Sequence, residues 1–283
     1  MNSQNGGYGA QEVGTPDTNA PDFGNSSDHL ERAAERSVPL RPGVTLPDWS
    51  LVREEPARAA LAAIVDLIGV GTPKWSPLAA TEDQVWRCVL EQFAAFARAP
   101  SLGEIADTTG LAPDAVVEEL KRLRARDVVV LDDDGRITGA YPFTERSTGH
   151  RVVLRGKTLS AMCAIDALGV GAMFGAHTEI ESLCRFCGTP IRVKTGDSGI
   201  VISDIAPEGA VVWIGYYYAD GCAATSTCTV LAFFCSDDHL AAWRAGEGAG
   251  RSGVRLSVDT ALQVGKAIFV PILQPRFERD SPP

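Results

Sequence analysis

Cys163 and Asp166 stand three residues apart in an apolar segment, TLSAMCAIDALGVGAMF, at residues 158–174. The segment predicts a buried helix, and positions three apart on a helix share one face. A thiolate and a carboxylate would then point the same way, as nucleophilic and proton-transfer chemistry require. A free cysteine is often buried without a function. An unpaired carboxylate in so apolar a helix is costly, however, so Asp166 favours a chemical role.

Cys228 opens a second apolar segment, CTVLAFFC, which predicts a strand over residues 228–234. Taken alone, such a cysteine is more often a core thiol than a reactive one. It becomes a candidate only if this strand lies over the helix of Cys163.

Cys184 and Cys187 form a CxxCG motif, which is half of a zinc knuckle. A complete site needs two more ligands, and the later cysteines are six and seven residues apart, at Cys222, Cys228 and Cys235. Because no second CxxC exists, the motif favours a structural turn with buried thiols. We expect no stoichiometric zinc.

The elements that must position these residues fall into an α+β pattern with two parts. Residues 1–45 have no hydrophobic periodicity and predict a disordered tail. Residues 46–141 predict a helical, winged-helix-like domain: helices over 57–67 and 82–98, a short helix capped by Ser101 with Glu104, a helix begun by Pro113, and a hairpin over 128–141.

Residues 142–275 predict a catalytic domain with a mixed or antiparallel sheet and packed helices. Its strands are expected near residues 152–154, 180–183, 191–194, 200–205, 210–218 and 228–234. Its helices are expected over 158–174, 237–245 and 258–269. Residues 276–283 form a C-terminal tail.

Charge and cysteine content limit the classes of function. The 283 residues carry a net charge of −10, the wrong sign for a protein that mainly grips phosphate backbones. Four basic residues between 121 and 126 are followed by Asp127 and an acidic turn, so nucleic-acid binding is disfavoured. No apolar run reaches about 18 residues, so we expect no membrane partner. The N-terminus lacks the features of a secretory signal, which predicts a cytoplasmic protein. In that reducing compartment the seven cysteines are expected to be free thiols.

Several segments, in order, resemble the organomercurial (alkylmercury) lyases. They are YPFTERSTGHRV from Tyr141, the helix with Cys163 and Asp166, Cys184 with the later Gly-Thr-Pro, Cys228 through Phe234, and Trp243. The resemblance covers roughly residues 100–269. Cys187 and Cys222 look like additions to the family pattern.

The resemblance implies protonolytic cleavage of the carbon–mercury bond of R–Hg⁺ to R–H and Hg²⁺. Cys163 and Cys228 would bind mercury, because soft thiolates are its preferred ligands. Asp166 would relay the proton and lie near the metal. No cofactor is implied beyond an external thiol for product release, and cytosolic thiols or a mercuric reductase would accept the Hg²⁺.

Two alternatives remain open at the level of sequence. A relative of these lyases could act on another carbon–heteroatom bond in specialised metabolism. A thiol-based metal or redox sensor could use the winged-helix domain to read DNA, although the net acidity counts against it.

Overall fold

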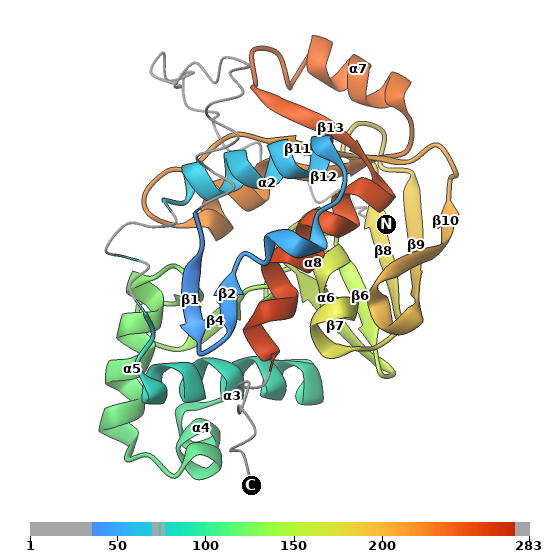
Figure 1. The fold of residues 1–283 in the computed structure, drawn as a ribbon. Helices are drawn as coiled ribbons and strands as arrows, with labels where there is room; N and C mark the ends of the chain where they lie inside the picture. The colour runs from blue at the N-terminus through green and yellow to red at the C-terminus, as the bar shows by residue number, and fades with distance from the viewer. Residues whose placement is uncertain (1–35, 70–73, 75–76, 275–283) are drawn as a thin grey trace, which may run out of the picture.

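The computed structural model describes residues 36–69, 74 and 77–274. Helices α3 (Ala80–Phe96), α4 (Leu102–Thr109) and α5 (Pro113–Ala125) lie together at one end of the molecule (Figure 1). Helix α7 (Asp237–Ala245) lies at the other end, beside strand β13 (Gly253–Ser257). Helix α2 (Glu55–Leu67) precedes α3, after a short turn η1 (Trp49–Leu51). The predicted helices and the Ser101–Glu104 capping box are confirmed.

The main sheet has eight strands in the order β10-β9-β8-β6-β7-β5-β4-β3, and every neighbouring pair is antiparallel. The sheet is therefore antiparallel, one of the two forms that the sequence predicted. Its strands are β3 (Val129–Leu131), β4 (Ile137–Ala140), β5 (Phe143–Thr144), β6 (Arg151–Leu154), β7 (Lys157–Ala161), β8 (Thr178–Leu183), β9 (Pro190–Gly196) and β10 (Val201–Ala206).

A second sheet of three antiparallel strands has the order β12-β11-β13. Its strands are β11 (Val211–Gly215), β12 (Leu231–Phe234) and β13 (Gly253–Ser257). Helix α7 (Asp237–Ala245) follows β12, and the side chain of Ser236 caps its first turn. Short turns η3 (Asp197–Gly199), η4 (Ala223–Thr225) and η5 (Thr227–Val230) complete this half.

Two helices cross at the centre of the molecule: α6 (Ala164–Phe174) and α8 (Val258–Leu273). Glycines make the crossing close, since a Cβ on Gly169 would stand 2.2 Å from the ring of Phe269. Gly265 faces Gly169 at the same crossing, where its Cβ would lie 3.1 Å from the Gly169 Cα. This packing fixes α6, and with it Cys163 and Asp166, against the core.

Two elements near the candidate site differ from those predicted from the sequence. Residues 158–174 are not one helix, because Lys157–Ala161 pairs with its neighbours as β7 and the helix starts only at Ala164. Burial explains the error: an apolar run with no alternation fits a buried strand as well as a buried helix. Residues 228–234 are likewise split into η5 and β12.

The predicted disordered tail was wrong at its end. Strands β1 (Val38–Arg41) and β2 (Val44–Leu46) form an antiparallel hairpin. The side chain of Arg41 is buried, donates to the backbone oxygens of Gln274 and Pro271 at 2.6 and 3.2 Å, and pairs with Asp83 at 3.3 Å. The hairpin is therefore held to the end of α8. Most of the predicted tail, residues 1–35, and the tail at 276–283 lie outside the described residues.

The predicted boundary between the helical and catalytic parts falls after residue 141, yet β4 before it and β5 after it pair in the same sheet. The hairpin of the helical part thus forms one edge of the main sheet.

Three of the four basic residues of α5 and its C-cap, Lys121, Arg122 and Arg126, pair with carboxylates. Lys121 pairs with Glu118 at 2.7 Å, and Arg126 pairs with buried Glu82 at 2.5 Å. These ion pairs leave less positive charge for a phosphate backbone. Within the described residues, no helix combines the length and apolar character needed to cross a membrane.

Candidate active site

Cys163 lies at the junction between β7 and α6, where it is the N-cap of the helix. Its backbone is extended, and its Sγ accepts a hydrogen bond from the backbone N–H of Asp166 at 3.4 Å. Cys163 was predicted inside the helix, on the same face as Asp166. At the cap position, Cys163 instead meets Asp166 through the backbone N–H of that residue. The positive end of the helix dipole then points at the sulfur, which favours a thiolate.

Asp166 lies in the first turn of α6 and is 4% exposed. Burial raises the pKa of its carboxyl to about 7, because the ionised form loses its hydration. Contacts with the Cys163 and Cys228 side chains lower this pKa and offset part of the effect of burial. The carboxyl can therefore both hold and release a proton near neutral pH.

Cys228 reaches the site from η5, immediately before β12, and its Sγ donates to Oδ2 of Asp166 at 3.6 Å. Hydroxyl side chains of the TSTCT segment hold this turn. Thr227 Oγ1 donates to the Tyr217 oxygen at 2.6 Å, and Thr229 Oγ1 donates to the Ser226 oxygen at 2.6 Å. The hydroxyls satisfy carbonyls that a regular strand would otherwise pair, so the strand starts later than predicted.

The three predicted residues thus meet: one ligand atom from each of Cys163, Asp166 and Cys228 lies within 4.8 Å of the others. Burial raises the pKa of the Cys163 thiol, and the contact with Cys163 followed by burial raises the pKa of the Cys228 thiol. Without a metal, both sulfurs therefore stay protonated at neutral pH. A soft cation that binds them must displace their protons.

Asp127 is a positioning residue that the sequence analysis missed. Its Oδ2 accepts from the Tyr218 hydroxyl at 3.1 Å and from the Ala223 N–H at 2.9 Å, while Oδ1 accepts from the Tyr141 hydroxyl at 3.2 Å. Lys74 lies 3.7 Å from the same carboxylate. Asp127 therefore fastens the segment before Cys228 to the helical part. No local pattern marks it, since its partners are 14, 91 and 96 residues away.

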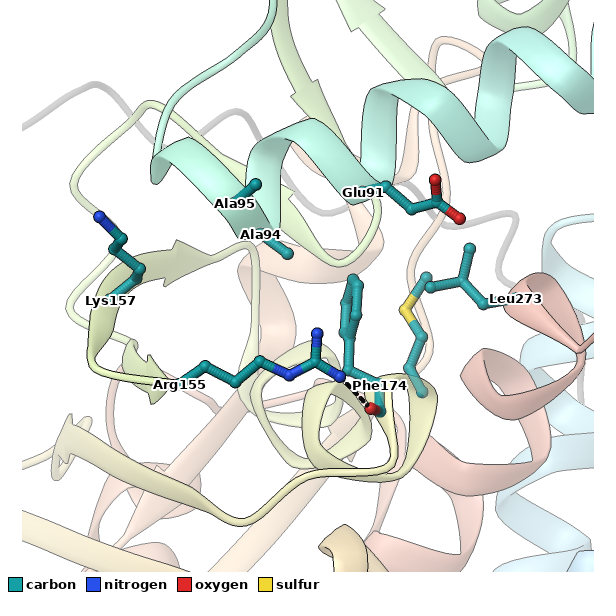
Figure 2. A pocket seen from close by; sticks show the side chains of 8 residues that line it. Glu91, Ala94, Ala95, Arg155, Lys157, Phe174 and Leu273 are labelled. Atoms are coloured by element: carbon teal, nitrogen blue, oxygen red, sulfur yellow. Dashed lines mark hydrogen bonds between the residues drawn. The ribbon is translucent and has the colours of Figure 1, made fainter. Parts of the chain in front are cut away.

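A separate surface pocket of about 450 Å³ lies between α3 and the start of β7. In Figure 2, Arg155 reaches toward Phe174, and its guanidinium donates to the Phe174 backbone oxygen at 2.8 Å. Glu91 and Lys157 also line it, but it contains no thiol. It therefore has no part in thiol chemistry.

The CxxC motif is not the isolated half-site that the sequence predicted. Its two thiols meet a cysteine and a histidine from the start of α7, in a second group that we call the knuckle cluster. Its members are Cys184, Cys187, Cys235 and His239.

Comparisons with known proteins identify relatives of this chain. The family model for alkylmercury lyase matches residues 143–270, which include both thiol groups. An alkylmercury lyase of Bacillus cereus is 31% identical over 194 residues, covering 68% of this chain and 82% of the relative. One of Clostridium butyricum matches with the same values.

The chain belongs to the alkylmercury lyase family. An alkylmercury lyase of Staphylococcus epidermidis is 30% identical over 59% of the chain and 72% of its own length. A crystal structure of the mercury-bound form of MerB2 shares the fold, with a TM-score of 0.61, 21% identity, and coverage of 77% of this chain and all of that one. Carbon–mercury bond cleavage is thus the reaction for which the two thiols and the carboxyl must account.

Proposed function

We propose that Cys163, Asp166 and Cys228 carry out the reaction of this carbon–mercury bond lyase. The observation that carries the proposal is the meeting of two thiols and a protonatable carboxyl within 4.8 Å of one another, all three at most 9% exposed. Mercury prefers thiolate sulfur, and a carbon–mercury bond breaks by protonation of the carbon. Two sulfurs and one acid are the smallest set of groups that supplies both the mercury ligands and the proton.

The first step is the exchange of a proton for mercury at Cys163. A sulfur–mercury bond forms as R–Hg⁺ binds, and the thiol proton passes to Asp166 in its carboxylate form. The N–H of Asp166, 3.4 Å from this sulfur, stabilises the charge that develops on it. Cys163 acts first because it caps the helix, whereas Cys228 donates toward the carboxyl.

The second step adds Cys228 to the same mercury and releases its proton. A second thiolate raises the electron density on the metal and makes the bound carbon more basic. Asp166 then delivers its proton to that carbon, the carbon–mercury bond breaks, and R–H leaves. The balance is R–Hg⁺ plus two thiols giving R–H, Hg²⁺ held by two thiolates, and one proton released to solvent. Burial keeps the proton on Asp166 until the carbon needs it.

The organomercurial is the substrate and brings the reacting metal with it, so no organic cofactor and no catalytic metal enter these steps. External thiols complete the cycle by taking Hg²⁺ from the two cysteines. Such thiols are kept reduced in the cytoplasm, where we place the reaction. Small cytosolic thiols or a mercuric reductase are the acceptors.

The direct test incubates the purified full chain with a phenylmercury salt and excess small thiol, and follows benzene. We expect many equivalents of benzene per chain, with Hg²⁺ recovered as its thiol complex. If mercury binds in one equivalent and no benzene forms, Cys163, Asp166 and Cys228 make a binding site and the proposed chemistry is wrong.

A further inference from the structure

We propose that a structural zinc ion binds at the knuckle cluster, apart from the carbon–mercury site. The cluster offers three sulfurs and one imidazole nitrogen, and these four atoms lie within 4.8 Å of one another. The ligands come from two places: the turn between β8 and β9, and the segment that joins the end of β12 to the first turn of α7. Such a set of three thiolates and one imidazole is typical of closed, tetrahedral zinc sites.

The spacing of the ligand atoms fits a tetrahedron around one zinc. With Zn–S near 2.3 Å and Zn–N near 2.0 Å, sulfurs lie about 3.8 Å from each other and about 3.5 Å from the nitrogen. The Sγ atoms of Cys187 and Cys235 are 3.7 Å apart. The Nδ1 of His239 is 3.8 Å from Cys184 Sγ and 3.0 Å from Cys235 Sγ. The ligand atoms are thus already gathered at nearly the separations that the ion needs.

Backbone hydrogen bonds shape the turn that carries the first two thiols. The N–H of Cys184 donates to the Thr189 oxygen, and the N–H of Gly188 donates back to the Cys184 oxygen, both at 2.9 Å. Gly188 has a φ of +70°, which a glycine adopts without strain. The N–H of Arg185 donates to the Phe233 oxygen at 3.0 Å and so ties the turn to β12.

The second pair of ligands is placed by the end of β12 and the cap of α7. Cys235 follows the last residue of the strand. Ser236 accepts from the N–H of His239 at 3.2 Å, which holds His239 in the first helical turn, four residues after Cys235. The ring of Phe186 covers this side, with its centroid 5.2 Å from that of His239. The second half of the cluster is thus Cys-x-x-x-His, and not the second CxxC that a paired knuckle would have.

Zinc accounts for the four groups better than a disulfide does. A disulfide requires sulfurs about 2.05 Å apart, and a bond between Cys187 and Cys235 would leave Cys184 and His239 without a role. Zinc binding uses all four: each thiol loses its proton to solvent as its sulfur–zinc bond forms, and His239 binds as neutral imidazole.

The position of the cluster explains what the ion would do. It joins the β8–β9 turn of the main sheet to β12 and α7 of the small sheet. Arg185, inside the knuckle, donates through Nη1 to the Thr229 oxygen at 3.1 Å, one residue after Cys228. A zinc ion here would hold the knuckle against the turn that carries the second mercury-binding thiol, without touching the mercury.

The test measures zinc in the full chain, purified without oxygen and under reducing conditions. We expect about one zinc per chain in the wild type. Cys187→Ser and Cys235→Ser should lose it, and Cys187 is exposed, so its change costs little packing. Because loss of even an outer partner weakens a metal site about 10–100-fold, loss of a ligand should weaken zinc affinity by more than that in chelator competition.

Two controls separate the clusters. Cys222→Ser, a half-buried cysteine outside both groups, should keep the zinc. The double variant Cys163→Ser/Cys228→Ser should also keep it, and with Co²⁺ in place of zinc it should show the thiolate–cobalt absorption that Cys187→Ser lacks. A wild-type chain that holds no zinc after anaerobic incubation with Zn²⁺ would overturn the proposal. So would zinc lost from the double variant but retained in Cys187→Ser.

Discussion

The Sγ of Cys228 lies 3.6 Å from Oδ2 of Asp166, although the two residues are 62 positions apart in the chain. The sulfur is the donor, so the carboxyl is already in contact with a proton that mercury must displace. On its other side, Asp166 meets Cys163 through its own backbone N–H. One residue therefore contacts both sulfurs, which links metal binding to proton transfer.

Replacing either thiol of this pair should abolish turnover. Cys163→Ser and Cys228→Ser each leave mercury with one thiolate, because hydroxyl oxygen is a hard donor and a poor ligand for a soft metal. We expect product formation to fall at least about 10³-fold in either variant, as for loss of a covalent nucleophile. Gas chromatography of benzene from a phenylmercury salt measures it.

Cys88→Ser is the matched control. Cys88 is buried in α3 and accepts from the Gln92 amide at 3.4 Å, which a serine hydroxyl can also do. Its turnover should stay near that of the wild type. Equal loss of activity in Cys88→Ser would mean that the serine variants fail through folding rather than chemistry.

Asp166→Asn should separate proton transfer from mercury binding. The amide keeps the shape of the side chain but cannot carry the proton, so turnover should fall by about 10²–10⁴-fold, the usual loss for a general acid–base. Hg²⁺ should still bind in one equivalent, since both sulfurs remain. Near-normal turnover in a folded Asp166→Asn protein would remove the acid–base role.

Local signals in the sequence accounted for most helices, but they left open whether the sheet is mixed or antiparallel. Capping residues such as Ser101 and Ser236 act within three residues of themselves, so they can be read directly from the chain. The split of residues 158–174 into β7 and α6 could not be read in this way. Its cause is the pairing of β7 with β5 and β6, which only tertiary structure supplies.

The same distinction applies to the candidate site. The types of Cys163, Asp166 and Cys228 and their order in the chain pointed to them through the family resemblance, and their contacts depend on the fold. Cys235 and His239 form a Cys-x-x-x-His pair, which does not repeat the CxxC spacing, and the fold brings Cys235 to Cys187 from 48 residues along the chain. The role of Asp127 could not be predicted from the sequence, because it depends on hydrogen bonds with residues far along the chain.

Asp127→Ala should loosen the segment that leads to Cys228. The change leaves two tyrosine hydroxyls and one backbone N–H without their acceptor. Because each buried donor left unpaired costs about 1–3 kcal/mol, we expect a loss of roughly 3 kcal/mol of stability. Turnover should fall as well, since Cys228 lies five residues beyond Ala223. Denaturant unfolding and benzene release measure the two effects.

Asp133→Ala is the control for this change, because Asp133 lies exposed in the turn between β3 and β4. It should alter neither stability nor turnover. A variant of Asp127 with unchanged stability and rate would show that the segment holds its place without the carboxylate.

Arg41→Ala should destabilise the fold although the residue lies far from the site in sequence. The arginine side chain is 2% exposed and joins Asp83 to the backbone oxygens at the end of α8. Its removal leaves a buried carboxylate without this partner, which costs about 3–5 kcal/mol. Arg36→Ala, which removes an exposed pair with Asp66, should cost less than about 1 kcal/mol. If denaturant unfolding gave the same loss of stability in Arg41→Ala and Arg36→Ala, Arg41 would not anchor the hairpin to α8.

Asp166 should also make the stability of the resting enzyme depend on pH. Burial raises the pKa of its carboxyl from 3.8 to about 7 in the folded chain. Between these values the folded state binds more protons than the unfolded state, so the free energy of unfolding falls as the pH rises. The contribution is fully present below about pH 4 and is lost by about pH 7, a change on the order of 4 kcal/mol.

Asp166→Asn isolates this effect, because an amide resembles the protonated carboxyl and does not titrate. All other groups cancel when the unfolding free energies of wild type and variant are subtracted at each pH. The unfolding free energy of the wild type minus that of the variant should fall between pH 4 and pH 7 and stay constant above pH 7. A difference that stays constant across this range would mean that Asp166 is ionised throughout, held so by its two sulfur contacts. It could then accept a thiol proton but would not store one for the carbon, and the stored-proton step of the mechanism would fail.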